Sequence, residues 1–575
     1  MKAFKDPIHR YIHLDDRERR IIGSPSFQRL RYVRQNGTAY LTYPSAVGNR
    51  FVHSLGVMHV ASELLEAALI NSDSKLRGRF LKKCRDDFGK LNARFRNVIF
   101  PDVRRVVRYA ALLHDIGVPP FSHALEDFMR NELELGDTEE KDRWKQFHSN
   151  YPKLPFHQFL GTRIIEEDGI IRDALGKYEP LVLRTLKTAE ADTSAFRTLF
   201  EVVVSDFDAD RLDYLIRDSH MSGADFGKFD LERLIECSEL YAHNDRFCLR
   251  PTIHAHSALE SVLLDRYKSY RWLYYHHRVM ATNAILRRVV EKLIWLQYKV
   301  DSPFAESPLY FQRELRIDKA EFARKGTLPR NHIVFFDDDY VLNALRQVYK
   351  QICCPEYGKD ANGENQQELN EVRVLLGEII FRSKCGVSLW KDIKDFEDFD
   401  NGVADSLQGI YSNHQEEVHR RSTGTEIHPD DRRVIKDPDL EKEGAACFAL
   451  NWIAENYLSV LQDVQQLEAH ITNKLRDAGM DAFILLGTSF FTPLATDRMK
   501  EFTVIKRGQL LYISAISSLA QQFAIISKKI VLLWAYLVFG RRNMQKKKRE
   551  EIEEAARSVV AEALCEWFEK KVTGP

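Results

Sequence analysis

Apolar residues recur every three to four positions through most of the first 300 residues, and this spacing predicts amphipathic helices. Over residues 103–114 they fall at i, i+3, i+4 and i+7, and Gly117 and Pro119 mark the end of that helix. The same pattern predicts helices over residues 207–217, 258–273 and 279–298. Two half-apolar runs within residues 240–250 instead predict a short β-hairpin.

The pattern changes downstream of residue 300. Residues 301–445 contain polar, turn-rich stretches, which predict a loop-rich helical accessory region. Helical periodicity returns over residues 446–575 and predicts a C-terminal regulatory or oligomerisation region that closes with an amphipathic helix over 550–572. The apolar run 530–539 is shorter than the roughly 20 residues that span a bilayer, so it is interpreted as a buried or oligomer-facing helix.

Composition excludes several classes of protein. The 575 residues carry 84 Lys plus Arg and 84 Asp plus Glu, so the formal net charge is zero. This balance argues against a nucleic-acid partner bound over a broad basic face, and an anionic ligand would have to meet a local cationic cluster. The 8 Cys residues form no CxxC pair, which predicts reduced thiols. We find neither a secretory signal nor a membrane span, so a cytoplasmic location is expected.

Four ionisable positions are candidate metal ligands: His53, His114, Asp115 and Asp210. A single His on an apolar helix is more often a core residue with a hydrogen-bond partner, so none of the four is informative alone. His114 and Asp115, however, end a strongly apolar helix, where buried polar groups need hydrogen bonds or a metal ion. Arg50 precedes His53 by three residues, which predicts a guanidinium and an imidazole on one helix face, a combination that suits a phosphate beside a metal.

A second polar helix face is predicted around Asp210. The positions that share it by i, i+4, i+7 and i+8 spacing are Asp210, Tyr214, Arg217 and Asp218, with Arg211 at its edge. Such a face offers a metal ligand, cations for phosphate, a stacking ring and a hydroxyl acceptor.

The order His, His-Asp, Asp resembles the HD-domain metallohydrolases. The segments KAFKDPIHRYIHL, SFQRLRYVRQNG, NRFVHSLGV, HDIGVPPFSH and DADRLDYLIRD are similar to the deoxynucleoside triphosphate (dNTP) triphosphohydrolase branch of that family. The resemblance covers residues 1–300. It implies a mainly α protein, in which an HD-domain helical bundle is followed by a largely helical C-terminal region with a few short strands. It also implies hydrolysis of dNTPs to deoxynucleosides and inorganic triphosphate.

The resemblance implies a role for each matching position. His53, His114, Asp115 and Asp210 match the metal ligands, and mixed nitrogen and oxygen donors suit Fe, Mn, Zn or Ni, with Mg accompanying the nucleotide. The catalytic positions are His157, Glu126, which pairs with it, and His123, which also holds triphosphate. The substrate-binding positions are Arg50 and Arg211 for triphosphate, Gln35 and Asp218 for the 3′-hydroxyl, Asn36, Tyr214 and Tyr275 at the nucleoside, and the pocket residue His277.

Several positions depart from the family pattern. Gln158 follows His157 where the family has Glu, and Asn36 stands where the vertebrate branch has Leu. Arg266 matches a phosphate-binding arginine only with a shift of one residue in register.

The amino-terminal segment also resembles a nucleotide-activator site at Lys2, Gln28 and Arg31. Gly23 replaces the Asp that reads guanine, so a regulatory nucleotide and assembly into a homodimer or homotetramer are expected without GTP as an obligatory activator. Two alternatives stay open: an HD phosphodiesterase or nuclease acting on cyclic or linear oligonucleotides, and a nucleotide-sensing partner protein. Analogy with bacterial relatives implies depletion of dNTPs against phage.

Overall fold

The computed structural model describes residues 2–299 except 98, 136–138, 190 and 244–245, then 333–353, 363–391, 461–491, 502–521, 530–539 and 546–573, with single residues 395, 399, 403 and 406. The chain divides into two compact units that are interleaved in sequence. The first comprises Met1–Leu273, Gln297–Leu345 and Pro493–Ser527, and the second Tyr274–Leu296, Arg346–Thr492 and Lys528–Pro575. The boundaries predicted at residues 300 and 445 lie outside the described residues, so the three-part organisation stays a prediction.

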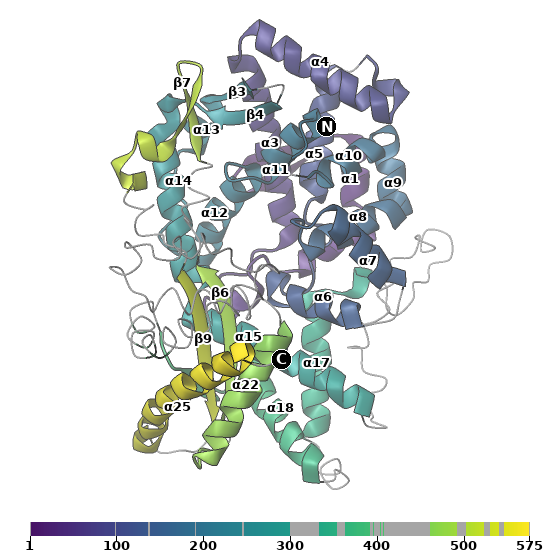
Figure 1. Ribbon diagram of the computed structural model, residues 1–575. Coiled ribbons are helices and arrows are strands. Elements are labelled where there is room, and N and C mark those ends of the chain that lie inside the picture. The colour runs from purple at the N-terminus through teal and green to yellow at the C-terminus, as the bar shows by residue number, and fades with distance from the viewer. Residues whose placement is uncertain are drawn as a thin grey trace. The chain divides into compact units, whose positions relative to one another are not determined.

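Three helices form the centre of the first unit. Helix α3 (Arg50–Asn71) packs against α5 (Phe100–Leu113) and α12 (Ala209–Ser222) (Figure 1). Each of the three carries fully buried apolar side chains, such as Val57, Val107 and Leu215. Helix α5 lies where the sequence predicts it, and His114 follows its last residue.

Further helices complete the α-helical part of the first unit. They are α1 (Asp16–Ile22), α2 (Pro25–Gln28), α4 (Ser74–Leu91), α6 (Glu126–Leu135), α7 (Glu139–Asn150), α8 (Phe156–Glu167), α9 (Gly169–Leu175), α10 (Glu179–Leu186), α11 (Ala195–Val203), α13 (Leu231–Glu236) and α14 (His256–Ser269). Helix α17 (Asp338–Ile352) begins in the same unit.

Three antiparallel hairpins complete the first unit. They are β1 (Lys2–Asp6) with β2 (Arg10–Leu14), β3 (Ser238–His243) with β4 (Arg246–Pro251), and β7 (Thr503–Lys506) with β8 (Gln509–Tyr512). The β3–β4 pair confirms the predicted hairpin, although its turn at 244–245 lies outside the described residues. Strand β7 lies against β4, where Arg250 Nε donates to Thr503 Oγ1 at 3.1 Å.

The second unit combines helices with an antiparallel sheet in the order β5 (Gly386–Ser388), β9 (Ile530–Phe539), β6 (Ala482–Phe491). Helix α22 (Leu461–Asp477) packs against β6 and against α25 (Lys546–Thr573). Helices α15 (His277–Lys299) and α18 (Gly363–Phe381) also belong largely to this unit. Helix α25 confirms the predicted closing helix.

The helix predicted over residues 530–539 is wrong, because this run forms the central strand β9. Consecutive side chains such as Leu537 and Val538 are both fully buried, so both faces of the strand are covered. A strand that is buried on both faces has an unbroken run of apolar residues in its sequence. Periodicity does not distinguish a run of this length from a buried helix. Strand β6, beside it in Figure 1, was not predicted either.

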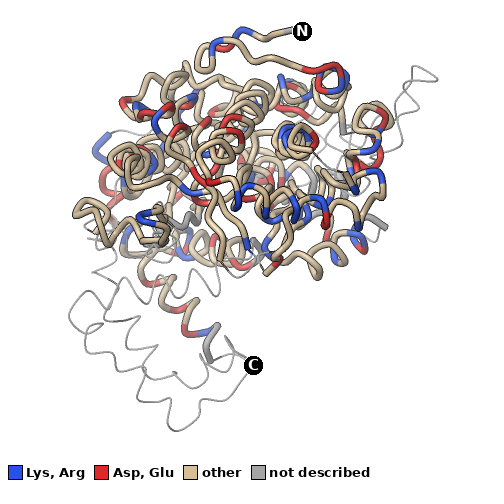
Figure 2. Tube along the Cα trace, turned by 90° about the horizontal axis from the view of Figure 1, so that it is seen from above, with Lys and Arg blue, Asp and Glu red and all other residues tan. Residues whose placement is uncertain are grey.

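The predicted fold class is confirmed, since helices dominate the described residues and the strands form small sheets. Lys and Arg are interspersed with Asp and Glu along the described trace (Figure 2), which agrees with the zero formal charge. Within the described part of the chain, no helix is long and apolar enough to cross a membrane.

Candidate active site

Helix ends of the first unit carry the four predicted metal ligands. Helix α3 begins at Arg50, so His53 lies on its first turn. His114 is the residue after α5, and Asp115 follows it directly. Asp210 lies on the first turn of α12. Both α3 and α12 follow a residue whose side chain caps the helix, which fixes where the helix starts and therefore which way these side chains point.

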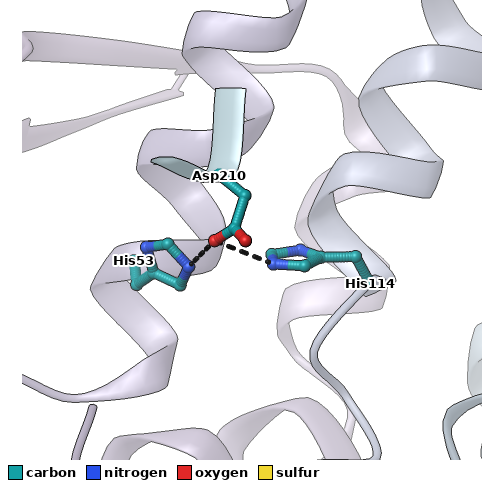
Figure 3. A group of neighbouring side chains, drawn as sticks. All are labelled: His53, His114 and Asp210. Atoms are coloured by element: carbon teal, nitrogen blue, oxygen red, sulfur yellow. Dashed lines mark hydrogen bonds and ion pairs between the residues drawn. The ribbon is translucent and has the colours of Figure 1, made fainter. Parts of the chain in front are cut away.

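His53, His114 and Asp210 point toward one another (Figure 3). Asp210 Oδ1 lies 2.9 Å from His53 Nε2 and 3.8 Å from His114 Nε2. The carboxylate of Asp115 joins the group, with one oxygen 3.7 Å from His53 Nε2 and the other 3.5 Å from His114 Nε2. The candidate ligand atoms of His53, His114 and Asp210 all lie within 4.8 Å of one another.

The hydrogen bonds of the two imidazoles fit a metal ion. His114 Nδ1 lies 2.7 Å from the carbonyl of Ala111, which can only accept, so Nδ1 donates and Nε2 keeps a free lone pair. That Nε2 atom is buried and has no hydrogen-bond partner. His53 likewise uses Nδ1, at 2.8 Å from Asp213 Oδ2, and turns Nε2 toward Asp210. Two imidazoles with carboxylate oxygens form a donor set that suits a divalent transition metal.

The electrostatics of this group also favour a cation. Burial alone would lower the pKa of His53, but hydrogen bonds to Asp210 and Asp213 raise it to about 9. Burial alone would raise the pKa of Asp210, but the neighbouring imidazoles hold it well below its ordinary value. The negative potential that retains a proton on His53 Nε2 would equally stabilise a metal ion at the same place.

Charged groups behind His53 hold its ring in place. The sequence did not reveal the role of Asp213, and Arg217, predicted among the cations for phosphate, instead bonds to Asp213 and Asp6. Asp213 accepts from His53 Nδ1, from His9 Nε2 at 2.6 Å, and from Arg217 through two contacts of 2.8 Å. Arg217 in turn donates to Asp6 at 2.9 Å. Asp213 is fully buried, and through it Asp6 and His9 of the β1–β2 hairpin are connected to the candidate metal centre. Carboxylates behind a ligating imidazole orient the ring and raise its basicity.

Replacing Asp213 by Asn should therefore weaken metal binding without removing a ligand. The amide keeps the shape of the carboxylate but loses its charge, and we expect metal affinity to fall roughly 10- to 100-fold. Isothermal titration of the metal-free protein with Mn²⁺ measures this. Asp225→Asn removes a charge paired with Lys228 at the surface and should leave the affinity unchanged. Equal affinities for wild type and Asp213→Asn would contradict the orienting role.

A second cluster joins helices α6 and α8 near the candidate metal centre. Glu126 is the first residue of α6, and its Oε1 lies 2.9 Å from His157 Nδ1 and accepts from the His157 backbone N–H at 2.8 Å. Its other oxygen, Oε2, lies 2.6 Å from His123 Nδ1. His157 and Glu126 are buried, whereas the side chain of His123 is 63% exposed. The structure thus brings together the three residues predicted to act in catalysis.

Close backbone packing holds this cluster against the His114–Asp115 turn. A Cβ added at Gly117 would lie 2.2 Å from the backbone N of Gly161 and 2.2 Å from the carbonyl oxygen of His157, so only glycine permits α8 to approach. Gln158 Nε2 donates to the carbonyl of His114 at 3.2 Å. The Gln that replaces the family's Glu therefore joins α8 to the metal-ligand turn.

Three arginines of the first unit are candidate phosphate ligands; Arg50 and Arg266 are buried, and Arg211 is half-buried. Arg50 donates to Asp115 Oδ2 at 2.5 Å and to Ser122 Oγ at 3.1 Å. Arg211 donates to Asp208 at 2.6 Å. Arg266 is 1% exposed, and its Nε and Nη1 atoms have no hydrogen-bond partner, although Nη1 lies 4.0 Å from Asp206 Oδ1. Buried guanidinium donors without partners are costly unless an anion meets them.

A π-helical turn, Tyr270–Tyr274, lies between Arg266 and Tyr275. A π turn takes up about one more residue than an α turn. The match of Arg266 to a phosphate-binding arginine stays a prediction.

Comparisons with known proteins agree with this geometry. The protein MJ1154 of Methanocaldococcus jannaschii, which is uncharacterized, is 31% identical over 398 residues, covering 68% of this chain and 69% of that protein. The human deoxynucleoside triphosphate triphosphohydrolase SAMHD1 is 29% identical over 268 residues, covering 44% of this chain and 38% of that protein. A phosphohydrolase structure from Bacteroides thetaiotaomicron has a TM-score of 0.53 at 19% identity, covering 94% of this chain and 100% of that one. The chain belongs to the HD-domain phosphohydrolase family.

As a member of this family, the chain is a metal-dependent phosphohydrolase. Family membership alone does not identify its substrate. No family model matches the chain. The chain spans 69% of the archaeal relative but only 38% of human SAMHD1. The Bacteroides phosphohydrolase, at 19% identity, shows the fold alone.

The predicted sugar-binding positions of this HD-domain phosphohydrolase fall in both units. Gln35 and Asp218 are buried in the first unit, and Gln35 Oε1 has no hydrogen-bond partner. Asn36 and Tyr214 are half-buried in the same unit. Tyr275 and His277 are half-buried in the second unit, and both ring nitrogens of His277 are buried without a hydrogen-bond partner. Their roles stay predictions.

The predicted activator positions lie in the first unit. Lys2 begins β1. Gln28 Nε2 donates to the carbonyl of Ile22 at 2.6 Å, and its Oε1 accepts from Arg31 Nε at 2.8 Å. The exposed Arg31 guanidinium lies 3.6 Å from the ring centroid of Phe51. Regulation through these residues stays a prediction.

Proposed function

We propose that this HD-domain phosphohydrolase hydrolyses dNTPs to deoxynucleosides and inorganic triphosphate. The observation that carries the proposal is a buried cation at the candidate metal centre. Arg50 is 5% exposed and contacts Asp115, whose carboxylate lies within 3.7 Å of both imidazoles. A guanidinium beside a metal site suits a phosphate chain. The similarity to SAMHD1, named as a triphosphohydrolase, supports the same substrate class.

Two groups of residues would have different roles in phosphate hydrolysis. His53, His114, Asp115 and Asp210 would hold a divalent transition metal, which supplies Lewis-acid polarisation of a phosphate oxygen and a nucleophile from water. Arg50, Arg211 and Arg266 would offset the charge that builds on the polyphosphate, with Mg accompanying the nucleotide. Burial strengthens these interactions, since water does not screen them.

The leaving group needs a proton, and His157 is placed to supply it. Attack at the α-phosphorus breaks the bond to the 5′-oxygen of the deoxynucleoside, which departs as an alkoxide unless it is protonated. Glu126 occupies His157 Nδ1, so Nε2 is the atom free to deliver the proton. His123, on the other oxygen of Glu126, would contact the triphosphate.

The nucleoside would be recognised through buried polar groups. Gln35 and Asp218 would bind the 3′-hydroxyl, and the partnerless Oε1 of Gln35 supports this role. Asn36 and Tyr214 of the first unit would contact the nucleoside. Tyr275 and His277 belong to the second unit, and for them we propose the roles that the family resemblance implies, exclusion of a ribose 2′-hydroxyl by Tyr275 and a nucleoside contact by His277. A site built around buried polar groups rejects a substrate that leaves them unpaired.

We also propose that a nucleotide regulates the enzyme and its assembly. A nucleotide bound at Lys2, Gln28 and Arg31 would promote a homodimer or homotetramer, in which GTP is not obligatory because Gly23 cannot read guanine. The enzyme would act in the cytoplasm and deplete dNTPs against phage. Full activation by GTP together with no response to any dNTP would contradict this regulation.

Product analysis tests the proposed reaction. The purified full chain is incubated with Mn²⁺, Fe²⁺, Co²⁺ or Mg²⁺ and each dNTP, alone and in mixtures, and products are resolved by ion-exchange chromatography. We expect equal amounts of deoxynucleoside and triphosphate, with ribonucleoside triphosphates as the matched control. Pyrophosphate release would contradict cleavage of the bond to the 5′-oxygen. In a parallel incubation with cyclic and linear oligonucleotides, release of nucleoside monophosphates would favour a phosphodiesterase or nuclease. Nucleotide binding without any product would favour a sensor.

A further inference from the structure

The turn that follows the proposed metal ligands has an unusual backbone. Phe121 and Ser122 have φ angles of 56° and 54°, in the left-handed region that residues with a side chain rarely adopt. Ser122 Oγ contacts Arg50 Nε at 3.1 Å and donates to the carbonyl of Arg34 at 2.6 Å. His123, the next residue, contacts Glu126. A turn in this conformation persists only where surrounding contacts fix it.

One buried carboxylate supplies such a contact from far along the chain. Asp338, the first residue of α17, is fully buried. Its Oδ1 accepts from the backbone N–H of Phe121 at 2.6 Å. Its Oδ2 accepts from the backbone N–H of Arg34 at 3.0 Å and from the Arg34 guanidinium at 3.2 Å. Because Arg34 precedes Gln35, this single side chain joins the turn to the loop that would bind the sugar.

Phe336, two residues before Asp338, is connected through Arg29 to the beginning of the same turn. This guanidinium is 2% exposed and donates to the carbonyl of Phe336 at 2.8 Å. It also donates to the carbonyls of Ile116 at 2.7 Å and Val118 at 2.9 Å. Segment 336–338 is therefore connected to both ends of the turn, to residues 116 and 118 through Arg29 and to Phe121 through Asp338.

We infer that Asp338 is a positioning residue of the active site, which fixes the 116–123 turn so that Arg50 and His123 face the polyphosphate. Among the described residues, its hydrogen-bond partners are Phe121 and Arg34, so it makes no hydrogen bond to any of the proposed metal ligands. Its influence on chemistry passes through the turn. The catalytic part of this inference rests on the proposed function, whereas the fixing of the turn rests on the hydrogen bonds alone.

Two measurements on Asp338→Asn test the two parts separately. Hydrogen exchange with mass spectrometry reports the amides of residues 116–125, and steady-state kinetics reports kcat/KM for a dNTP. Asp339→Asn is the matched control, because it removes a neighbouring charge whose side chain is 60% exposed and which lies 3.6 Å from Arg34. Thermal melting shows that each variant is folded. If Asp338→Asn does not fold, Arg34→Lys, which retains the backbone hydrogen bond to Asp338, replaces it in both measurements.

We expect faster exchange in residues 116–125 of Asp338→Asn and a fall in kcat/KM of roughly 10- to 100-fold. In a His123→Ala background the same change should add less than about threefold, because coupled residues are not additive. Wild-type exchange in the variant overturns the inference even if no dNTP is hydrolysed, and inactivity of the wild type counts only against the proposed function. Faster exchange with unchanged kcat/KM, or full additivity with His123→Ala, overturns the positioning role.

Discussion

Replacing His114 by Ala should remove the bound metal and abolish turnover in the same variant. The free lone pair of His114 Nε2 is buried without a hydrogen-bond partner, and Nδ1 is committed to the Ala111 carbonyl. Without this imidazole, His53, Asp115 and Asp210 must hold the ion alone. We expect inductively coupled plasma mass spectrometry to find less than about a tenth of the wild-type metal content.

The stability of the variant separates loss of the metal from loss of the fold. Metal that binds only the folded state raises the melting temperature, so added Mn²⁺ should stabilise wild type and not His114→Ala. His220→Ala is the matched control, because His220 is exposed on α12, the helix that carries Asp210. Wild-type metal content and turnover in His114→Ala would show that the metal site lies elsewhere.

Much of the candidate metal centre could be predicted, because spacing within single helices indicates where its residues lie. Helical spacing places Arg50 and His53 on one turn, and the apolar periodicity of residues 103–114 carries His114 into the interior. The motif order then predicts that distant segments meet, and the structure brings His53, His114 and Asp210 within reach of one ion.

The residues that support the centre could not be found in this way. Asp213 holds His53 and His9, which lie 160 and 204 residues away in sequence, and Asp338 holds Phe121 across 217 residues. No spacing rule relates such positions, since tertiary packing alone brings them together. Asp213 shares its helix with Asp210 and Asp218, so an additional carboxylate there gave no distinct signal.

Strand β9 was missed for a related reason. The apolar run 530–539 is consistent with either a buried helix or a buried strand, and pairing with β5 and β6 decides between them. Those partners come from residues 386–388 and 482–491, far from the run itself. Local sequence therefore predicts the helices better than the sheet of the second unit.

Replacing Glu126 by Gln should lower kcat. It should also shift the loss of activity on the basic side of the pH profile to a lower pH. Burial alone would lower the pKa of His157, but Glu126 outweighs burial and raises that pKa above its ordinary value of 6.5. The pKa of Glu126 itself lies well below its ordinary range despite burial, because His157 and His123 surround it. The carboxylate therefore stays charged and keeps His157 protonated toward higher pH.

The sign of the pH effect follows from the proposed role of His157 as general acid. Only the protonated imidazole can donate to the departing 5′-oxygen, so activity falls as pH rises through the pKa of His157. The amide introduced by Glu126→Gln carries no charge, so that pKa should drop and the basic limb of the kcat profile should shift to lower pH. His157→Ala should lower kcat roughly 10²- to 10⁴-fold, the range typical of proton transfer by a side chain.

A matched control distinguishes this effect from a general change in charge. Asp127→Asn alters the next residue of α6, whose side chain is 74% exposed and paired with Arg130, and its kcat profile should superimpose on that of wild type. Circular dichroism at each pH shows whether the variants stay folded. An unshifted basic limb in Glu126→Gln would mean that His157 does not act as the general acid, and direct participation of His157 in the attack on phosphorus would then explain the cluster better.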